Sequence, residues 1–214
     1  DSDRDAFYLR VRDAASLFLG SARQTVLHDE CFAFMQLGIM LERAGQTARI
    51  VDVKHRSLAP SHRPDTRSTA ESAIESAQAM ALLRSCSAIE PFFKKTSRTP
   101  ASRPVVAFLY GEKLFPRSVL YCLSQASALL AEIRNEVGTS MGVTSAAALE
   151  ALRQSVQDAS TSKDLESVLH TELTRVIEAT GTVCAHIHSE FFDPTFEGTL
   201  TSSGLSQSQS QGQT

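Results

Sequence analysis

The chain has 214 residues, of which 42% are hydrophobic, and its 21 basic and 24 acidic residues leave a net charge of −3. This length suffices for one domain that hides roughly 70% of the surface exposed by its unfolded chain. A charge so close to zero creates no overall field that would gather nucleic acid or an anionic membrane, so we expect neither as a partner. No run approaches the roughly 18 to 20 apolar residues that a membrane span needs.

Four cysteines are spread widely along the chain, with no C-x-x-C pair and no metal-finger spacing: Cys31, Cys86, Cys122 and Cys184. This spacing favours buried free thiols of a reducing compartment over disulfides. The first residues, DSDRDAF, are polar and acidic rather than typical of a signal peptide. We therefore expect a cytoplasmic protein.

Helical periodicity recurs along the chain and strand alternation does not, which predicts an all-α fold. A first helix is expected over residues 3–24, with Phe7, Val11, Ala14, Phe18 and Leu19 along one side. A second helix can begin after Asp29, a good N-cap, and its apolar positions continue at spacings of three and four to Leu58. At 1.5 Å per residue this helix would be roughly 35 to 40 Å long, enough for the spine of a bundle.

The rest of the chain predicts further helices between loops rich in proline and glycine. Ser68 and Glu71 form a capping-box signal for a helix over residues 69–90, which Pro91 would break or kink. A short helix is expected over 104–111, and another over 115–137 that Gly138 ends.

Two helices are expected in the last third of the chain. Thr144 can cap a helix that runs to Asp158, and Thr161 can start a final long helix with Gly181 as a weak point near its middle. We therefore predict a bundle of about five to seven helices with two long spine helices, in one domain over residues 1–198. Residues 199–214 are rich in Ser and Gln and are expected to form a disordered tail.

The second helix carries an unusual number of polar residues on one flank: Glu42, Gln46, Arg49 and Asp52. Arg43 lies on the opposite edge, with Thr47 and Ile50 at i+4 and i+7. Two alternatives remain open. In the first, the flank is solvated and each ion pair contributes about 0 to 1 kcal/mol to stability. In the second, the flank is a semi-buried network in which losing one partner lowers stability by roughly 3 to 5 kcal/mol.

The same residues also permit a catalytic hypothesis. Glu42 or Glu30 would act as the general base, Arg43 and Arg49 would hold a carboxylate or phosphate, and His28 or His55 would shuttle protons.

A metal site is a weaker candidate. Near the end of the last helix, His186 and Glu190 have the i, i+4 spacing of helical metal ligands, but His188 is rotated away from them. An exposed salt-bridged pair explains this spacing as well, and we predict no metal. The sequence contains no phosphate loop or other cofactor motif, so no cofactor is expected.

Three segments resemble the alpha-E family of bacterial helical proteins, which are named for an E-R helix motif. They are HDECFAFMQLGIMLERAGQTARIVDVKH, ALLRSCSAIEPF and FPRSVLYCLSQASALLAEI. The resemblance makes Asp29, Glu30, Glu42, Arg43, Thr47, Arg49 and Asp52 positions of the motif. It covers about residues 7–192. The chain looks like the C-terminal two-thirds of a family member, because an earlier E-R helix that is usual in the family is missing.

Alpha-E proteins are typically encoded beside, or fused to, circularly permuted ATP-grasp ligases. The resemblance therefore implies a non-catalytic accessory or interaction domain that acts with such a ligase in peptide or amide-bond formation. The alternative is an enzyme or small-ligand-binding protein with a carboxylate/arginine site on the E-R helix. A closed cleft converging on Glu42, Arg43 and Arg49 would favour this alternative, and a flat exposed flank would favour docking. The oligomeric state is left open by the sequence.

Overall fold

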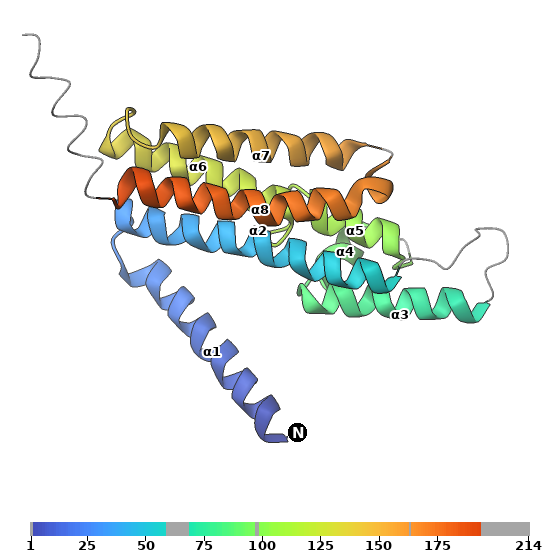
Figure 1. The fold of residues 1–214 in the computed structure, drawn as a ribbon. Coiled ribbons are helices and arrows are strands. Elements are labelled where there is room, and N and C mark those ends of the chain that lie inside the picture. The colour runs from blue at the N-terminus through green and yellow to red at the C-terminus, as the bar shows by residue number, and fades with distance from the viewer. Residues whose placement is uncertain (1, 59–68, 97–98, 163, 194–214) are drawn as a thin grey trace, which may run out of the picture.

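A computed structural model describes residues 2–58, 69–96, 99–162 and 164–193 of the chain. Within these ranges it contains eight α-helices and no strand, which confirms the all-α prediction (Figure 1). Eight helices are one more than the predicted maximum of seven, because the predicted third helix is divided into two. The proposed tail, residues 199–214, lies outside the described ranges, as does the end of the expected domain.

Four long helices run side by side and form the core of the bundle (Figure 1). They are α2 (Glu30–Leu58), α6 (Val119–Val137), α7 (Val143–Thr161) and α8 (Leu165–Phe191). The two longest, α2 with 29 residues and α8 with 27, are the two predicted spine helices. Leu37, Leu41 and Ala48 of α2 are buried in a cluster with Leu169 and Leu173 of α8, so apolar contacts hold the two spines together.

Three shorter helices cover one end of this core. They are α3 (Thr69–Ser85), α4 (Ile89–Lys95) and α5 (Ser102–Gly111). The prediction of one helix ending at Pro91 is wrong, since the chain turns earlier, at Ser87, whose φ is 53°. Pro91 then lies in the first turn of α4, where a missing N–H costs nothing because first-turn N–H groups have no partner within the helix.

The start of α7 also differs from the prediction. Gly142, not Thr144, occupies the N-cap position, and its φ of 67° places it in the left-handed region. A Cβ on Gly142 would lie 2.4 Å from the Phe191 ring, so both the conformation and the space require glycine. Because Gly142 has no side chain to cap the helix, Glu190 of α8 accepts hydrogen bonds from the backbone N–H groups of Thr144 (2.7 Å) and Ser145 (2.9 Å).

Other helix ends lie a few residues from their expected positions. The α6 helix begins at Val119, after the N-cap Ser118, rather than at residue 115, and Gly138 follows its end with a φ of 113°. The α8 helix begins after Asp164 rather than at Thr161, and it continues through Gly181 without interruption.

The first helix, α1 (Ser2–Thr25), matches its predicted bounds but stands apart from the bundle (Figure 1). Every side chain from residue 3 to residue 18 is exposed, and Ala22 is the one buried side chain among residues 3–25. The helix diverges from α2 and projects away from the core. Its apolar side therefore has no cover within the described part of the chain.

No described helix combines the length and the apolar character required to cross a membrane. All four cysteines are free thiols, as predicted. Two of them, Cys86 and Cys122, are buried, and burial raises the pKa of both thiols to about 11. Cys31 and Cys184 are exposed, contrary to the expected burial.

Candidate functional site

The residues at the start of α2 form the junction with α1. Asp29 caps the helix as predicted, because its Oδ1 accepts a hydrogen bond from the backbone N–H of Phe32 (3.1 Å). The His28 ring stacks on Phe32 with ring centroids 4.1 Å apart, and its Nε2 lies 3.0 Å from the carbonyl oxygen of Arg23. His28 and Glu30 are exposed. Glu30 lies twelve residues from Glu42, roughly 18 Å along the helix, so these catalytic candidates do not converge.

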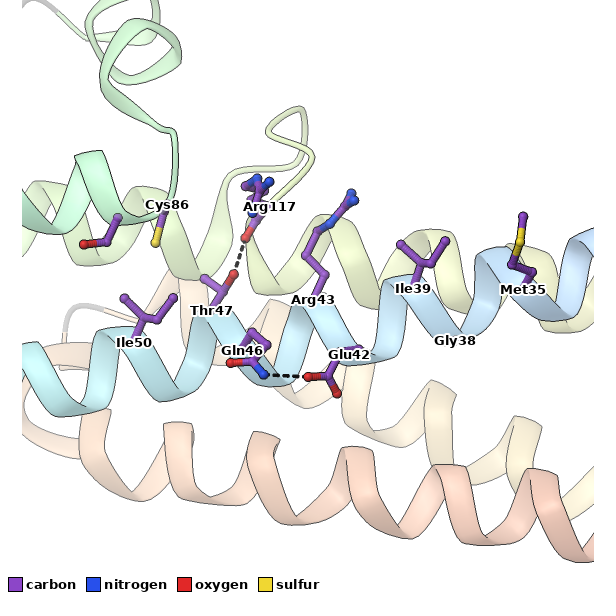
Figure 2. A pocket seen from close by; sticks show the side chains of 11 residues that line it. Met35, Gly38, Ile39, Glu42, Arg43, Gln46, Thr47, Ile50, Cys86 and Arg117 are labelled. Atoms are coloured by element: carbon purple, nitrogen blue, oxygen red, sulfur yellow. Dashed lines mark hydrogen bonds between the residues drawn. The ribbon is translucent and has the colours of Figure 1, made fainter. Parts of the chain in front are cut away.

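The flank of α2 that faces α8 is solvated over most of its length. Glu42 accepts a hydrogen bond from Gln46 Nε2 at 2.6 Å, and both side chains are exposed (Figure 2). Arg49 is exposed as well and lies beside Gly45 and Thr180. The structure thus supports the solvated alternative for these three polar residues.

Asp52 is the exception on this flank. It is buried, and its Oδ1 lies 2.6 Å from Nδ1 of His170 on α8. The contact joins the two spine helices near the end of α2. It was not predicted from the sequence, because the two residues are 118 positions apart. The side chain of the candidate His55 lies outside the described residues.

The opposite edge of α2 holds the loop between α5 and α6. Arg43 Nη1 donates a hydrogen bond to the carbonyl oxygen of Pro116 (3.2 Å), and Thr47 Oγ1 donates one to that of Arg117 (2.8 Å) (Figure 2). These contacts span 73 and 70 residues of sequence. Two segments that carry the family resemblance, LERAGQT and FPRSV, are therefore bound directly to each other.

The loop is fixed from its own side as well. The Ser118 hydroxyl donates a hydrogen bond to the carbonyl oxygen of Glu112 and accepts one from the Tyr121 N–H (3.1 Å). The Cys122 thiol lies 3.5 Å from the carbonyl oxygen of Pro116. Together with the bonds from α2, these contacts fix the backbone from residue 112 to residue 118 and set the position of Arg117.

An open groove of about 530 Å³ lies between α2, this loop and the turn after α3 (Figure 2). Its lining comprises Met35, Gly38, Ile39, Glu42, Arg43, Gln46, Thr47, Ile50, Ser85, Cys86 and Arg117. Three predicted site residues, Glu42, Arg43 and Thr47, line it, whereas Arg49 and Asp52 do not. Arg117 was not assigned to a site from the sequence. Its place in the FPRSV segment was the signal that could have found it.

The groove carries positive charge at the edge next to the loop. Burial lowers the pKa of Arg43, and the nearby guanidinium groups of Arg117 and Arg23 lower it further, although Cys122 and Tyr121 act in the opposite direction. Arg117 is exposed and forms no hydrogen bond or ion pair through its guanidinium within the described residues. Like charges thus gather at this edge without a carboxylate bound to either arginine in the described chain.

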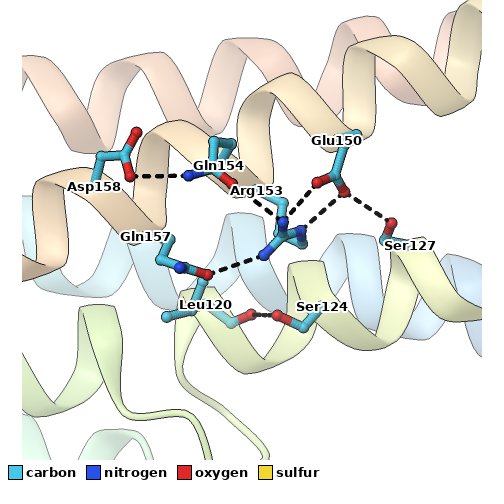
Figure 3. Close-up of polar contacts among 8 residues, drawn as sticks. All are labelled: Leu120, Ser124, Ser127, Glu150, Arg153, Gln154, Gln157 and Asp158. Carbon is cyan, nitrogen blue, oxygen red and sulfur yellow. Dashed lines mark hydrogen bonds and ion pairs between the residues drawn. The ribbon is translucent and has the colours of Figure 1, made fainter.

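Arg153 shows how the chain neutralises an arginine elsewhere (Figure 3). On α7 its guanidinium binds Glu150 with N···O distances of 2.8 and 2.5 Å, and it also donates to Gln157 at 3.0 Å. The hydrogen bonds from Arg153 lower the pKa of Glu150, and the same bonds raise the pKa of Arg153. Arg43 has a backbone carbonyl where Arg153 has a carboxylate.

The residues weighed as metal ligands, His186, His188 and Glu190, lie near the end of α8. Within the described residues, no group of three or more His, Cys, Asp or Glu side chains is arranged to hold a metal. Glu190, one of the residues weighed as a ligand, is instead bound to the start of α7.

The fold and the site define an all-helical bundle in which an E-R helix holds a loop from a distant part of the chain. The chain belongs to the Alpha-E family, described as a predicted alpha-helical domain with a conserved ER motif, whose sequence model matches residues 1–192. Glu42 and Arg43 form a Glu-Arg pair in the segment LERAGQT. The match covers residues 1–192 rather than about residues 7–192, and it does not support the detail that the chain corresponds to the C-terminal two-thirds of a member. Searches of curated proteins and of solved structures found no match.

Proposed function

We propose that this chain is a non-catalytic interaction domain that acts in the bacterial cytoplasm with a circularly permuted ATP-grasp ligase in amide-bond formation. The family resemblance supplies the ligase as partner. The observation that carries the interaction role is the exposed apolar surface of α1. The free thiols on all four cysteines support a reducing compartment.

The α1 helix exposes several large apolar side chains: Phe7, Tyr8, Val11, Leu17 and Phe18 are each 51–74% exposed. Of these, Phe7, Val11 and Phe18 share one side of the helix. Contiguous apolar surface of this kind marks protein interaction sites, and aromatic side chains contribute most to binding at their centres. In addition, an isolated helix is only marginally stable in water, and α1 lacks the packing that stabilises the other long helices. A partner that covers this side would stabilise α1.

The placement of the polar candidates supports a role without catalysis. Arg43 and Thr47 use hydrogen bonds to fix a loop, Asp29 caps a helix, and Asp52 joins two helices. Arg43 and Arg49 point to different sides of α2, so they do not form the predicted clamp around one anion.

The test is a binding titration between the purified chain and the ATP-grasp ligase encoded beside it, measured by calorimetry. We expect a complex whose affinity falls by roughly tenfold or more in the double variant Phe7→Glu/Phe18→Glu, because two apolar anchors become charged. Leu114→Glu is the matched control, because Leu114 is 75% exposed in the loop between α5 and α6. We expect this variant to bind the ligase with an affinity within about twofold of wild type.

Circular dichroism on each variant would separate loss of binding from loss of folding. No complex with the wild-type chain, or equal affinity of the double variant and wild type, would contradict the proposal.

A further inference from the structure

We propose that the groove on α2 binds a small organic carboxylate, with the guanidinium groups of Arg43 and Arg117 around the carboxylate and the apolar body of the ligand against Met35, Ile39 and Ile50. This inference goes beyond the docking role of α1 and does not depend on it.

The positive edge of the groove is the first reason. Arg43 is half-buried, and it shares this edge with Arg117. Two neighbouring cations, one of them half-buried, repel each other, and an anion between them would remove this repulsion. Elsewhere the chain supplies such an anion itself, as Glu150 does for Arg153 (Figure 3). At the groove, no carboxylate of the described chain is bound to Arg43 or Arg117.

The orientation of the two arginines is the second reason. Figure 2 shows Arg43 and Arg117 extending to the same side of α2, beside the loop. Arg43 is anchored through Nη1 to the carbonyl of Pro116, and the backbone of Arg117 is anchored by Thr47. The Arg43 guanidinium and the backbone that carries Arg117 are therefore held in place before a ligand arrives, which lowers the entropy cost of binding. Guanidinium groups suit carboxylates because their N–H groups can pair with both oxygens.

The rest of the lining decides the kind of anion. Met35, Ile39, Ile50 and Cys86 make much of the surface apolar, and a volume of about 530 Å³ fits a molecule of amino-acid to dipeptide size. Glu42 lies on the α8 side of the same groove, with its carboxylate bound to Gln46. A negative charge there disfavours ligands with several negative charges, such as nucleotides, and favours a single carboxylate on an apolar body.

The experiment compares two nearly identical probes by ligand-detected NMR: N-acetyl-L-phenylalanine, which has a free carboxylate, and its neutral amide. We expect saturable binding of the acid with a Kd of about 1 mM or tighter, and binding of the amide at least roughly tenfold weaker. Arg117→Gln should weaken acid binding by a similar factor. The fold should survive this change, because the side chain is exposed and the loop is bound through the backbone of Arg117.

Arg153→Gln is the matched control, since it removes a guanidinium outside the groove, and acid binding should remain within about twofold of wild type. Arg43→Lys adds a second check that keeps the positive charge but loses the paired geometry, and weaker acid binding is expected.

Three results would overturn the proposal. They are equal affinities for the acid and the amide, unchanged acid binding in Arg117→Gln, and no saturable binding up to about 10 mM. Inorganic phosphate forms the third arm of the titration. Phosphate that binds more tightly than the acid would overturn the assignment to a carboxylate.

Discussion

The α1 and α8 helices have nearly the same length, 24 and 27 residues, yet their surroundings differ completely. Leu169, Leu173 and Val176 of α8 are fully buried against neighbouring helices. In α1, by contrast, Phe7 and Phe18 are more than half exposed. The comparison shows that apolar residues at helical spacing are enough to predict a helix. Whether those residues are buried depends on which other helices pack against them.

The difference also separates two kinds of stabilisation. Apolar packing and cross-helix hydrogen bonds hold α8 in the core. Glu190 accepts such bonds from the backbone of α7, and His170 is bound to Asp52 of α2. At its far end α1 relies on its own backbone hydrogen bonds. We therefore expect the free energy of unfolding of the bundle to be insensitive to most of α1.

The largest effect is expected from the same substitution made in the two helices. Leu173→Ala leaves a cavity in the core and should lower the free energy of unfolding by about 2 to 5 kcal/mol. Leu17→Ala removes a side chain that is 74% exposed and should change the free energy of unfolding by less than about 0.5 kcal/mol. Urea denaturation measures both values. Similar losses in the two variants would show that α1 is packed as tightly as α8.

An intermediate effect is expected at the cap that joins α8 to α7. The Glu190 carboxylate accepts hydrogen bonds from two backbone N–H groups, and Glu190→Gln removes its negative charge. This substitution should lower the free energy of unfolding by about 1 to 3 kcal/mol at neutral pH. Glu178→Gln, at an exposed position of the same helix, is the control and should have little effect.

This cap should also make stability depend on pH. Burial alone would raise the pKa of Glu190, but the hydrogen bonds from Ser145 and Thr144 outweigh it and hold the pKa below its ordinary value of 4.5. The folded state then releases this proton more readily than the unfolded state, so the stabilisation is present above pH 4.5 and is lost as the pH falls through the lowered pKa. Glu190→Gln should lack this part of the acid dependence. Equal slopes in the variant and wild type would contradict the assignment.

The smallest effects are expected on the solvated flank of α2. Glu42→Gln and Arg49→Ala should each change the free energy of unfolding by less than about 0.5 kcal/mol, because both side chains are exposed. Thr47→Val, on the opposite edge, leaves the Arg117 carbonyl without its partner and should cost about 1 kcal/mol or more. Denaturation midpoints check the three variants together. A loss well above 1 kcal/mol in Arg49→Ala would restore the semi-buried alternative.

Much of the fold was predictable because the signals are local. The bounds of α1 follow from apolar periodicity, Asp29 caps α2 as its residue type suggests, and Gly138 ends α6 with a positive φ. The start of α7 was not predictable, because its cap is a carboxylate 46 residues further along the chain. Pro91 was misjudged for a related reason: the turn at Ser87 places it in a first turn, where proline is tolerated.

The candidate site was predicted only in part. The sequence placed Arg43, Thr47 and Ile50 on an edge of α2 apart from Arg49, and these three line the groove whereas Arg49 does not. Glu42 and Gln46, which the sequence assigned to the other flank, line the same groove. It paired Arg43 with Arg49 as a possible clamp, whereas the folded chain places Arg117 beside Arg43.

The sequence by itself determined an all-α chain, the order of its helices and the two faces of α2, since these depend on residues within a few turns of one another. Only the tertiary structure decided that the other described helices leave α1 uncovered and that Arg117 joins Arg43 at one groove. The physical reason is distance along the chain: the contacts that place the loop connect residues 70 and 73 positions apart, and no local pattern encodes such a pairing.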